Sequence, residues 1–304
     1  MSAPAPTLTG VPVPVLTVRT VSLADPGDLL DLIPTAEHVS TWVRRGDGFV
    51  AWGEAARIDT FGPERMIAAD SWFTALRSAA DVEDQVSLPG TGLVAFGSFA
   101  FDDADPAGGS LVVPRILVGR RGGQSWVTTI DPDGGASLTL DGERAPLTFP
   151  SDVIYSRGSA TPREWMAKVA DAVSRIKAGE AAKIVLARDV GASSSSPLDT
   201  RALVTRFTQA YPTTWAFAVD GLVGATPEML VRRERRMVAS RVLAGTIRRT
   251  GDDERDLAHA AALARSSKDL EEHEFAVESL AAALAPFVES ANIPEVPSVL
   301  HLPN

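Results

Sequence analysis

The sequence contains no cysteine among its 304 residues. This absence excludes disulfides, cysteine-ligated zinc, iron–sulfur clusters and a thiol nucleophile. The sequence also lacks an apolar run long enough to cross a membrane, and its N-terminus lacks the basic and apolar segments of a signal peptide. We therefore expect a cytoplasmic protein without a membrane partner.

Positive charge is scarce, because 29 Lys and Arg stand against 39 Asp and Glu, giving a formal net charge of −10. The densest basic group is formed by the arginines of residues 232–236. A nucleic-acid backbone is bound by a broader basic surface, so no nucleic-acid partner is expected. An anionic metabolite still fits such a protein if a few cations or a bound metal set the local field.

The order of predicted strands and helices favours an α+β fold in which helices cover antiparallel sheets. The clearest helix start is a capping box, Thr161 to Glu164, with proline at the first helical position. At 45% hydrophobic residues the chain can bury the core of a single domain over 1–304, with 1–150 as its first half and 160–304 as its motif-bearing half. Strands are expected at 15–21, 40–58 (as a hairpin), 91–101, 109–118, 124–130, 136–140, 183–190 and within 213–248. Helices are expected at 71–80, 161–179, 199–210 and, as a pair, within 253–288.

Acidic residues concentrate in the stretch SSKDLEEHEFAVESL, residues 266–280. Acids are favoured near a helix N-terminus, so an ordinary solvated helix start is the simpler interpretation. At helical spacing, however, Asp269 and Glu272 share one side with Ala276, beside the apolar stripe of Leu270, Val277, Leu280 and Leu284. Glu272 would then stand at the border of the buried face, where a carboxylate needs a partner. A metal site is therefore the second interpretation, and spacing alone leaves both open.

Three further stretches place chemically useful residues next to apolar segments. Lys183 begins the strand-like KIVLAR and is either an exposed lysine at a strand edge or a general base. Glu228 lies in GATPEML and either caps a turn or acts as a general acid. Gly245, in LAGT, would let a ligand or another backbone segment approach closely. Each signal is weak when it is taken alone.

Taken in order, KIVLAR, GATPEML, LAGT and SKDLEEH resemble the chorismate-utilising enzymes, and most closely the isochorismate synthases of the menaquinone-specific type. The upstream segments RRGDGFVAWGEA and AFGSFAFD are similar to the N-terminal half of that family. The resemblance covers nearly the whole chain. It implies one large α+β domain built from two facing antiparallel sheets with outer helices.

The resemblance also implies a role for each motif. Lys183 corresponds to the lysine that activates water for attack at C2 of chorismate, and Glu228 to the acid that protonates the departing C4 hydroxyl. Glu272 corresponds to a ligand of the Mg²⁺ that holds the substrate carboxylate, with Asp269 nearby. The segment beside the substrate ring corresponds to Ala244, Gly245 and Thr246. We therefore expect a monomeric, magnesium-dependent isomerase that feeds menaquinone synthesis.

Three alternatives to this assignment remain. A salicylate synthase resembles the same pattern and goes on to eliminate pyruvate, an isochorismate synthase can supply a siderophore pathway, and a silent chorismate-binding subunit can share the fold. The family also continues past the point that matches the final PSVLHLPN, into a glycine-rich carboxylate-binding region and a second metal glutamate. We therefore expect the C-terminal part of the fold to be missing and the natural chain to be longer.

Overall fold

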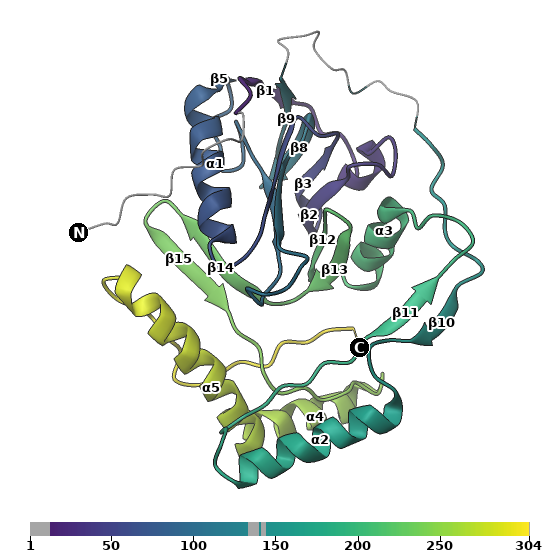
Figure 1. Cartoon of the computed structure of the whole chain (residues 1–304), viewed down its shortest axis with the longest axis vertical. Coiled ribbons are helices and arrows are strands. Elements are labelled where there is room, and N and C mark those ends of the chain that lie inside the picture. The colour runs from purple at the N-terminus through teal and green to yellow at the C-terminus, as the bar shows by residue number, and fades with distance from the viewer. Residues whose placement is uncertain (1–12, 133–139, 141–143, 304) are drawn as a thin grey trace. The chain divides into compact units, whose positions relative to one another are not determined.

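The computed structural model describes residues 13–132, 140 and 144–303. The chain forms two compact units (Figure 1). The first unit comprises Met1–Leu147 and Asp199–Pro227, and the second comprises Thr148–Leu198 and Glu228–Asn304. The polypeptide therefore leaves the first unit, returns to it for one helix and one hairpin, and leaves it again.

The first unit is built on an eight-stranded sheet with the order β13-β12-β2-β3-β8-β9-β1-β5. Neighbouring strands are antiparallel except for β1 and β5, which are parallel. The bounds of these strands are β1 Thr17–Leu23, β2 Ser40–Arg44, β3 Asp47–Trp52, β5 Asp81–Asp84, β8 Ile116–Arg121, β9 Gln124–Asp131, β12 Trp215–Val219 and β13 Leu222–Thr226. An antiparallel three-stranded sheet with the order β4-β7-β6 accompanies it, from β4 Ala56–Thr60, β6 Phe96–Phe99 and β7 Gly109–Val113.

Two helices and a 3₁₀ turn pack on these sheets: α1 (Arg65–Ala79), α3 (Thr200–Ala210) and η1 (Leu29–Leu32). Helix α3 begins where the Asp199 side chain accepts a hydrogen bond from the Arg201 backbone N–H. The same carboxylate pairs with the buried Arg201 guanidinium at 2.7 Å. A buried charge is tolerated only with such a partner, so this pair fixes the start of the helix.

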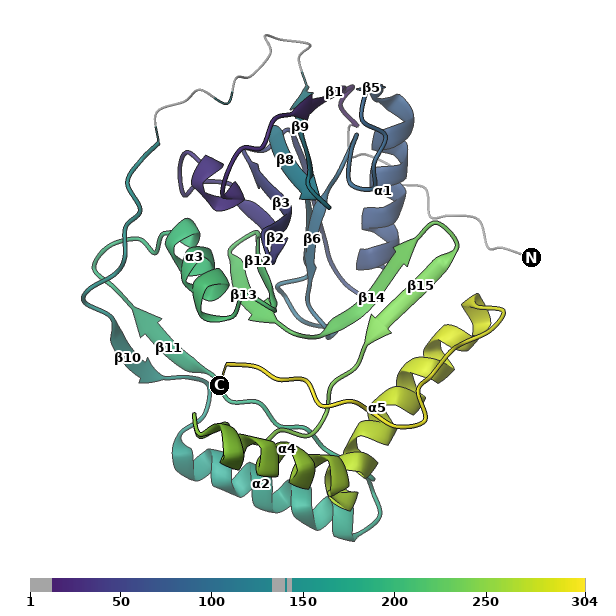
Figure 2. The same cartoon turned by 180° about the vertical axis from the view of Figure 1, so that it is seen from behind.

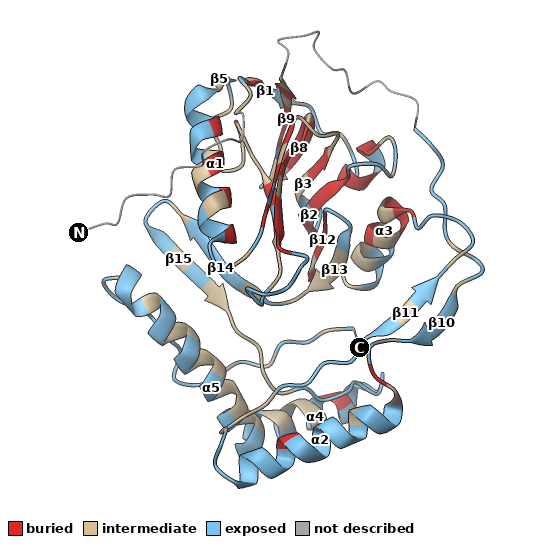
Figure 3. Cartoon of the chain, viewed as in Figure 1, coloured by how far each residue is buried: buried red, intermediate tan, exposed pale blue. Residues whose placement is uncertain are grey.

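The buried apolar side chains of the protein lie mainly in the first unit (Figure 3). Trp72 and Leu76 of α1 pack against Ile58 of β4 and Val113 of β7. A second cluster joins η1, α3 and strands of the large sheet, and a third surrounds Trp126. Each such side chain contributes about 1.5–3 kcal/mol on burial, so this unit holds the main hydrophobic core.

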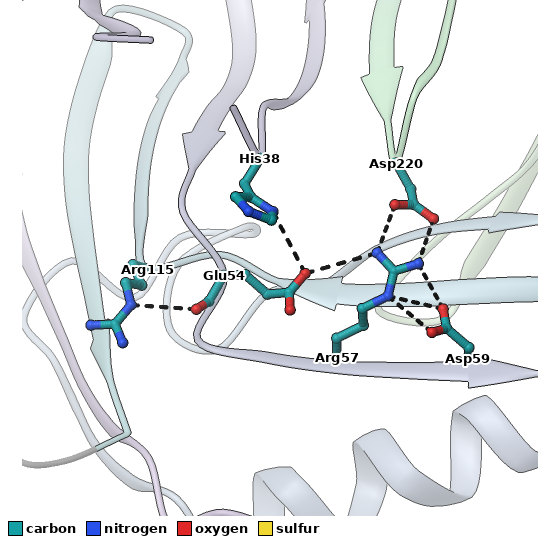
Figure 4. Close-up of polar contacts among 6 residues, drawn as sticks. All are labelled: His38, Glu54, Arg57, Asp59, Arg115 and Asp220. Carbon is teal, nitrogen blue, oxygen red and sulfur yellow. Dashed lines mark hydrogen bonds and ion pairs between the residues drawn. The ribbon is translucent and has the colours of Figure 1, made fainter. Parts of the chain in front are cut away.

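A charged cluster centred on Arg57 joins the two sheets of the first unit (Figure 4). Arg57 of β4 donates hydrogen bonds of 2.6 and 2.8 Å to the carboxylate of Asp220, in the turn between β12 and β13. It also pairs with Asp59 at 2.7 Å and with Glu54 at 3.8 Å, and Glu54 lies 3.8 Å from His38. The hydrogen bonds from Arg57 hold the pKa of Asp220 below its usual range, and those to Asp220 and Asp59 raise the pKa of Arg57.

The second unit contains three helices, two of which are the longest of the described chain, and two hairpins (Figure 2). Its helices are α2 Pro162–Lys177, α4 Asp253–Arg265, α5 Ser267–Leu284 and the 3₁₀ turn η2 Ala285–Phe287. Its hairpins pair β10 Ile154–Arg157 with β11 Val190–Ser193, and β14 Met229–Glu234 with β15 Met237–Arg241. Among its described residues only Ala160, Ala172 and Asp256 are buried. Packing within this unit is therefore much looser than in the first.

The predicted α+β class is confirmed, and so are the helices expected near 71–80, 161–179, 199–210 and 253–288. Residues 109–118 contain the whole of β7 and the start of β8 instead of one strand, because the strand is interrupted at Pro114, which cannot donate a hydrogen bond to a sheet. Of 91–101 only β6 is a strand, and 136–140 lies outside the described residues except for Leu140. No helix of the described segments is long and apolar enough to span a membrane. Whether 1–304 forms one domain stays a prediction.

Candidate active site

Lys183 lies between α2 and β11, in a segment that was predicted to be a strand over 183–190. That prediction is wrong: residues 183–189 have no regular secondary structure, and β11 begins only at Val190. A strand needs a hydrogen-bonded neighbour, and β10 pairs with β11 only from Val190 to Ser193. Consequently the apolar Val185 is 78% exposed. These residues favour a strand, but within the described part of this unit no neighbouring strand pairs with them.

The Lys183 side chain reaches the first part of α5. Its Nζ lies 3.4 Å from Oε1 of Glu272 and donates a hydrogen bond of 3.3 Å to the Glu272 backbone oxygen. The two side chains are 27% and 33% exposed, respectively. An ion pair that is partly withdrawn from water is screened less than a surface pair. The KIVLAR and SKDLEEH motifs therefore meet through their proposed base and metal ligand.

Gly245 contacts the same helix at Asp269. Its φ of +78° is a left-handed conformation that side chains disfavour. A Cβ on Gly245 would lie 3.0 Å from Cβ and 3.2 Å from Oδ1 of Asp269, closer than an ordinary van der Waals contact. Both the backbone conformation and the close approach require glycine here. The LAGT segment thus lies directly against the acidic side of α5.

Glu228 precedes β14 and is exposed. Its Oε1 accepts a hydrogen bond of 3.0 Å from the Leu243 backbone N–H. The register of the hairpin explains this contact, because Met229 opposes Arg241 and the residues just outside that pair are brought together. Through Leu243 the GATPEML motif is joined to the LAGT motif that follows it.

All of the residues assigned to the site thus lie in the second unit and form a continuous series of contacts. Glu228 contacts the residue before Ala244–Thr246, Gly245 contacts Asp269, and Glu272 contacts Lys183. Asp269 and Glu272 are three residues apart on α5, a spacing that places their Cβ atoms about 5–6 Å apart on one face. Segments far apart in the sequence therefore converge on one end of one helix.

The acids in the first turns of α5 differ in exposure. Glu271 and Glu274 are exposed, whereas Asp269, Glu272 and His273 are partly buried. The helix start is also capped, because the Ser266 side chain accepts a hydrogen bond of 3.3 Å from the Asp269 backbone N–H. The cap uses the backbone of Asp269 and leaves its carboxylate for another partner. The same stretch therefore holds an ordinary helix cap and the candidate site residues Asp269 and Glu272.

The donor set fits magnesium. Asp269 and Glu272 offer hard carboxylate oxygens, and magnesium takes one or two protein carboxylates while keeping several waters. The Lys183 ammonium already stands beside Glu272 as a cation. In the described part of the chain no group of three or more His, Cys, Asp or Glu residues is placed to hold a metal. The site therefore suits a metal that retains water or substrate oxygens, and it lacks the closed ligand set of a structural metal.

One supporting network was missed by the sequence reasoning. The buried Asp256 carboxylate accepts hydrogen bonds from the Thr250 backbone N–H at 2.7 Å and from Arg249 Nε at 2.9 Å. These bonds, led by the one from Thr250, hold the pKa of Asp256 well below its usual range. The network anchors the chain four residues after Thr246 to the first turn of α4. The signal in the sequence is the acidic first turn that follows Thr250-Gly251.

The chain matches the family described as chorismate binding enzyme over residues 12–304. The candidate isochorismate synthase MenF of Mycobacterium tuberculosis (strain ATCC 25618 / H37Rv) is 33% identical over 221 residues, which cover 69% of this chain and 54% of that protein. The salicylate biosynthesis isochorismate synthase of Pseudomonas aeruginosa is 28% identical over 320 residues, which cover 95% of this chain and 66% of that protein.

Among solved structures, MenF, the menaquinone-specific isochorismate synthase from Escherichia coli, aligns with a TM-score of 0.68 at 21% identity. The alignment covers 95% of this chain and 68% of that chain. At this identity the likeness shows the fold. The chain spans about half the length of the curated relatives it matches.

Proposed function

Because the chain belongs to the chorismate-binding enzyme family, we propose that it is an isochorismate synthase, an isomerase that interconverts chorismate and isochorismate. The observation that carries the proposal is the contact of Lys183 with Glu272. This contact places an amine beside a carboxylate of α5, on the helix face where Asp269 meets the LAGT segment. The names of the relatives support the same activity.

In the proposed reaction, a water oxygen forms a bond to C2 of chorismate, the ring double bonds shift, and the bond from C4 to its hydroxyl breaks. In its neutral form Lys183 accepts a proton from the attacking water, and Glu228 in its protonated form donates a proton to the departing hydroxyl. One water enters and one leaves, so the product is an isomer of the substrate. The hydrogen bond from Leu243 orients the Glu228 carboxyl group.

Asp269 and Glu272 would hold magnesium. The bound ion would supply positive charge that offsets the substrate carboxylates. Because Gly245 has no side chain, the backbone of the LAGT segment can lie directly against Asp269. We further propose that both compact units belong to one chorismate-binding domain, since the family match runs across both.

The proposed pathway is menaquinone synthesis. Two relatives carry names of the menaquinone type, whereas another is named for salicylate biosynthesis. Supply of a siderophore or salicylate pathway is therefore the alternative. Expression in a strain that lacks its menaquinone-specific isochorismate synthase tests the first assignment, and restored menaquinone is the expected result. Growth that stays dependent on added menaquinone, although the purified protein turns over chorismate, would favour the alternative.

Incubation with chorismate and magnesium tests the reaction itself. Separation of the products with mass detection should show isochorismate, which has the mass of the substrate. Salicylate formed without a partner lyase would instead identify a salicylate synthase. Calorimetry with chorismate tests the silent subunit, because binding without any turnover would sink the isomerase assignment. The presence of both Lys183 and Glu228 argues against that outcome, since a silent relative has no use for an acid and a base.

A further inference from the structure

We infer that Lys183 and the metal ion compete for the same carboxylate, so that the lysine occupies the Glu272 side chain in the metal-free protein and must leave when the metal binds. This inference rests on the proposed function, because it takes Glu272 as a metal ligand. Beyond the two separate roles, the position of Lys183 then depends on whether the metal is bound to Glu272.

The geometry of Lys183 carries the inference. Its Nζ lies 3.4 Å from Oε1 of Glu272 and 3.3 Å from the backbone oxygen of the same residue, so the ammonium group is held at two points of one residue. Within the described residues, neither side chain forms an ion pair with any other group. The lysine therefore neutralises the carboxylate that a magnesium ion would use.

Repulsion between the two cations disfavours their simultaneous binding to this carboxylate. Unit charges about 4 Å apart interact far more strongly than thermal energy at the effective dielectric of a protein surface, and a divalent ion doubles that repulsion. Glu272 is the carboxylate that pairs with Lys183, and Asp269 is the other proposed ligand. The metal must therefore displace the ammonium group, which lowers the affinity of the protein for the metal.

The chain around Lys183 permits this movement. Residues 183–189 have no regular secondary structure, and the lysine side chain is partly exposed on a flexible four-carbon stem. Once it has left Glu272, the ammonium group is free to turn toward the substrate, and it can act as the base after it has released its proton to solvent. Metal binding and placement of the base are in this way two results of one exchange.

A titration of the full chain with Mn²⁺ in the absence of substrate tests the exchange. The electron paramagnetic resonance signal of free Mn²⁺ measures how much of the ion is bound. Lys183→Met keeps the length of the side chain and removes its charge, so we expect it to bind Mn²⁺ at least about tenfold more tightly than the unmodified protein. Lys183→Arg keeps the charge and should remain weak. Lys177→Met, at the exposed end of α2, is the matched control and should leave binding unchanged. Lys183→Gln replaces Lys183→Met if circular dichroism shows that the latter does not fold.

Combination of Lys183→Met with Glu272→Gln should abolish the gain. Equal Mn²⁺ affinity of the unmodified protein and Lys183→Met, with binding lost in Glu272→Gln, would overturn the exchange and leave the metal assignment intact. Binding that ignores Glu272 altogether would overturn both the exchange and the assignment of this ligand. Formation of isochorismate by the unmodified protein is a separate measurement, so the failure of the proposed function is distinguishable from the failure of the exchange.

Discussion

The Cβ position of Gly245 lies 3.0 Å from the Cβ atom of Asp269. This contact places the loop of one sequence motif against the helix of another, although 24 residues separate them in the chain. Asp269 is a proposed metal ligand. A side chain at Gly245 would therefore change both the position of the loop and the position of this ligand.

Gly245→Ala should therefore impair activity more than stability. The left-handed backbone at this position costs alanine roughly 1–2 kcal/mol, and the new methyl group must also push against Asp269. Gly251→Ala is the matched control, because Gly251 has a similar φ of +83° but nothing within 4 Å of its Cβ position. Urea unfolding should show the backbone cost in both variants and a further loss in Gly245→Ala from its contact with Asp269, and only Gly245→Ala should raise the KM for chorismate. Equal kinetic behaviour would remove the loop contact from the site.

Lys183→Gln should lower kcat by at least about two orders of magnitude, the usual scale for a positioned general base. The side chain is partly exposed and its loss removes no buried apolar group, so the unfolding midpoint should change little. Steady-state rates and thermal denaturation on the same preparation check both statements. Near-normal turnover would exclude Lys183 from the proton transfer.

Two substitutions at Glu228 separate its proposed roles. Glu228→Gln keeps an oxygen that can accept the hydrogen bond from Leu243 but cannot deliver a proton, so kcat should fall about 100-fold or more with little change in KM. Glu228→Ala removes the acceptor as well and should also raise KM. If Glu228→Gln retained full kcat, the role of this residue would be confined to holding the loop.

Single alanine substitutions along α5 distinguish a metal ligand from an ordinary helix start. Glu272→Ala should raise the magnesium concentration for half-maximal activity by about tenfold or more, since a direct ligand is lost. Glu271→Ala and Glu274→Ala should have little effect, because these exposed neighbours point about 100° and 200° away around the helix. Similar losses of about 0.3–1 kcal/mol in all three, without metal dependence, would instead indicate a helix-dipole effect.

The pairing of Asp220 with Arg57 predicts a dependence of stability on pH. The pKa of Asp220 is lower in the folded state than its unfolded value near 3.9, so the contribution is complete above about pH 4 and is lost as the pH falls through the folded pKa. Asp220→Asn should cost about 1 kcal/mol at pH 7 and should flatten the loss of stability between about pH 4 and pH 2. Urea unfolding across this range checks it, with Asp70→Asn on the exposed side of α1 as the control. If the free energy of unfolding of Asp220→Asn fell with pH as steeply as that of the unmodified protein, the titration of Asp220 would not be linked to stability.

Local signals in the sequence predicted local structure well. The capping box at Thr161 is present in full, with the Thr161 side chain accepting from the Glu164 backbone and the Glu164 side chain accepting from the Thr161 backbone. The two residues lie three positions apart, so both hydrogen bonds of the capping box depend only on the local sequence. Helical spacing along α5 also placed Asp269 and Glu272 together on a partly buried side, but Leu270 of the apolar stripe expected beside them is exposed, and none of that stripe is fully buried.

The strand predicted at 183–190 failed because it depends on a distant segment and not on local sequence. The apolar and β-branched residues of KIVLAR favour a strand, but strand formation depends on a neighbour that the segment does not contain. Within the second unit, β10 pairs only with residues from Val190 onward. Sheet pairing is a property of two segments at once, and the pattern of one segment cannot supply it.

The residue types of the candidate site and their order could be predicted without a structure, because they are carried by four motifs of the chain. Which of these residues touch depends on tertiary packing. Lys183 and Glu272 are 89 residues apart, and their contact depends on how the segment after α2 lies against α5. Glu228 reaches Leu243 only because the hairpin register sets Met229 opposite Arg241. The local sequence sets local conformation through short-range hydrogen bonds and steric restrictions. Contacts between distant residues are set by packing and strand pairing across the whole unit.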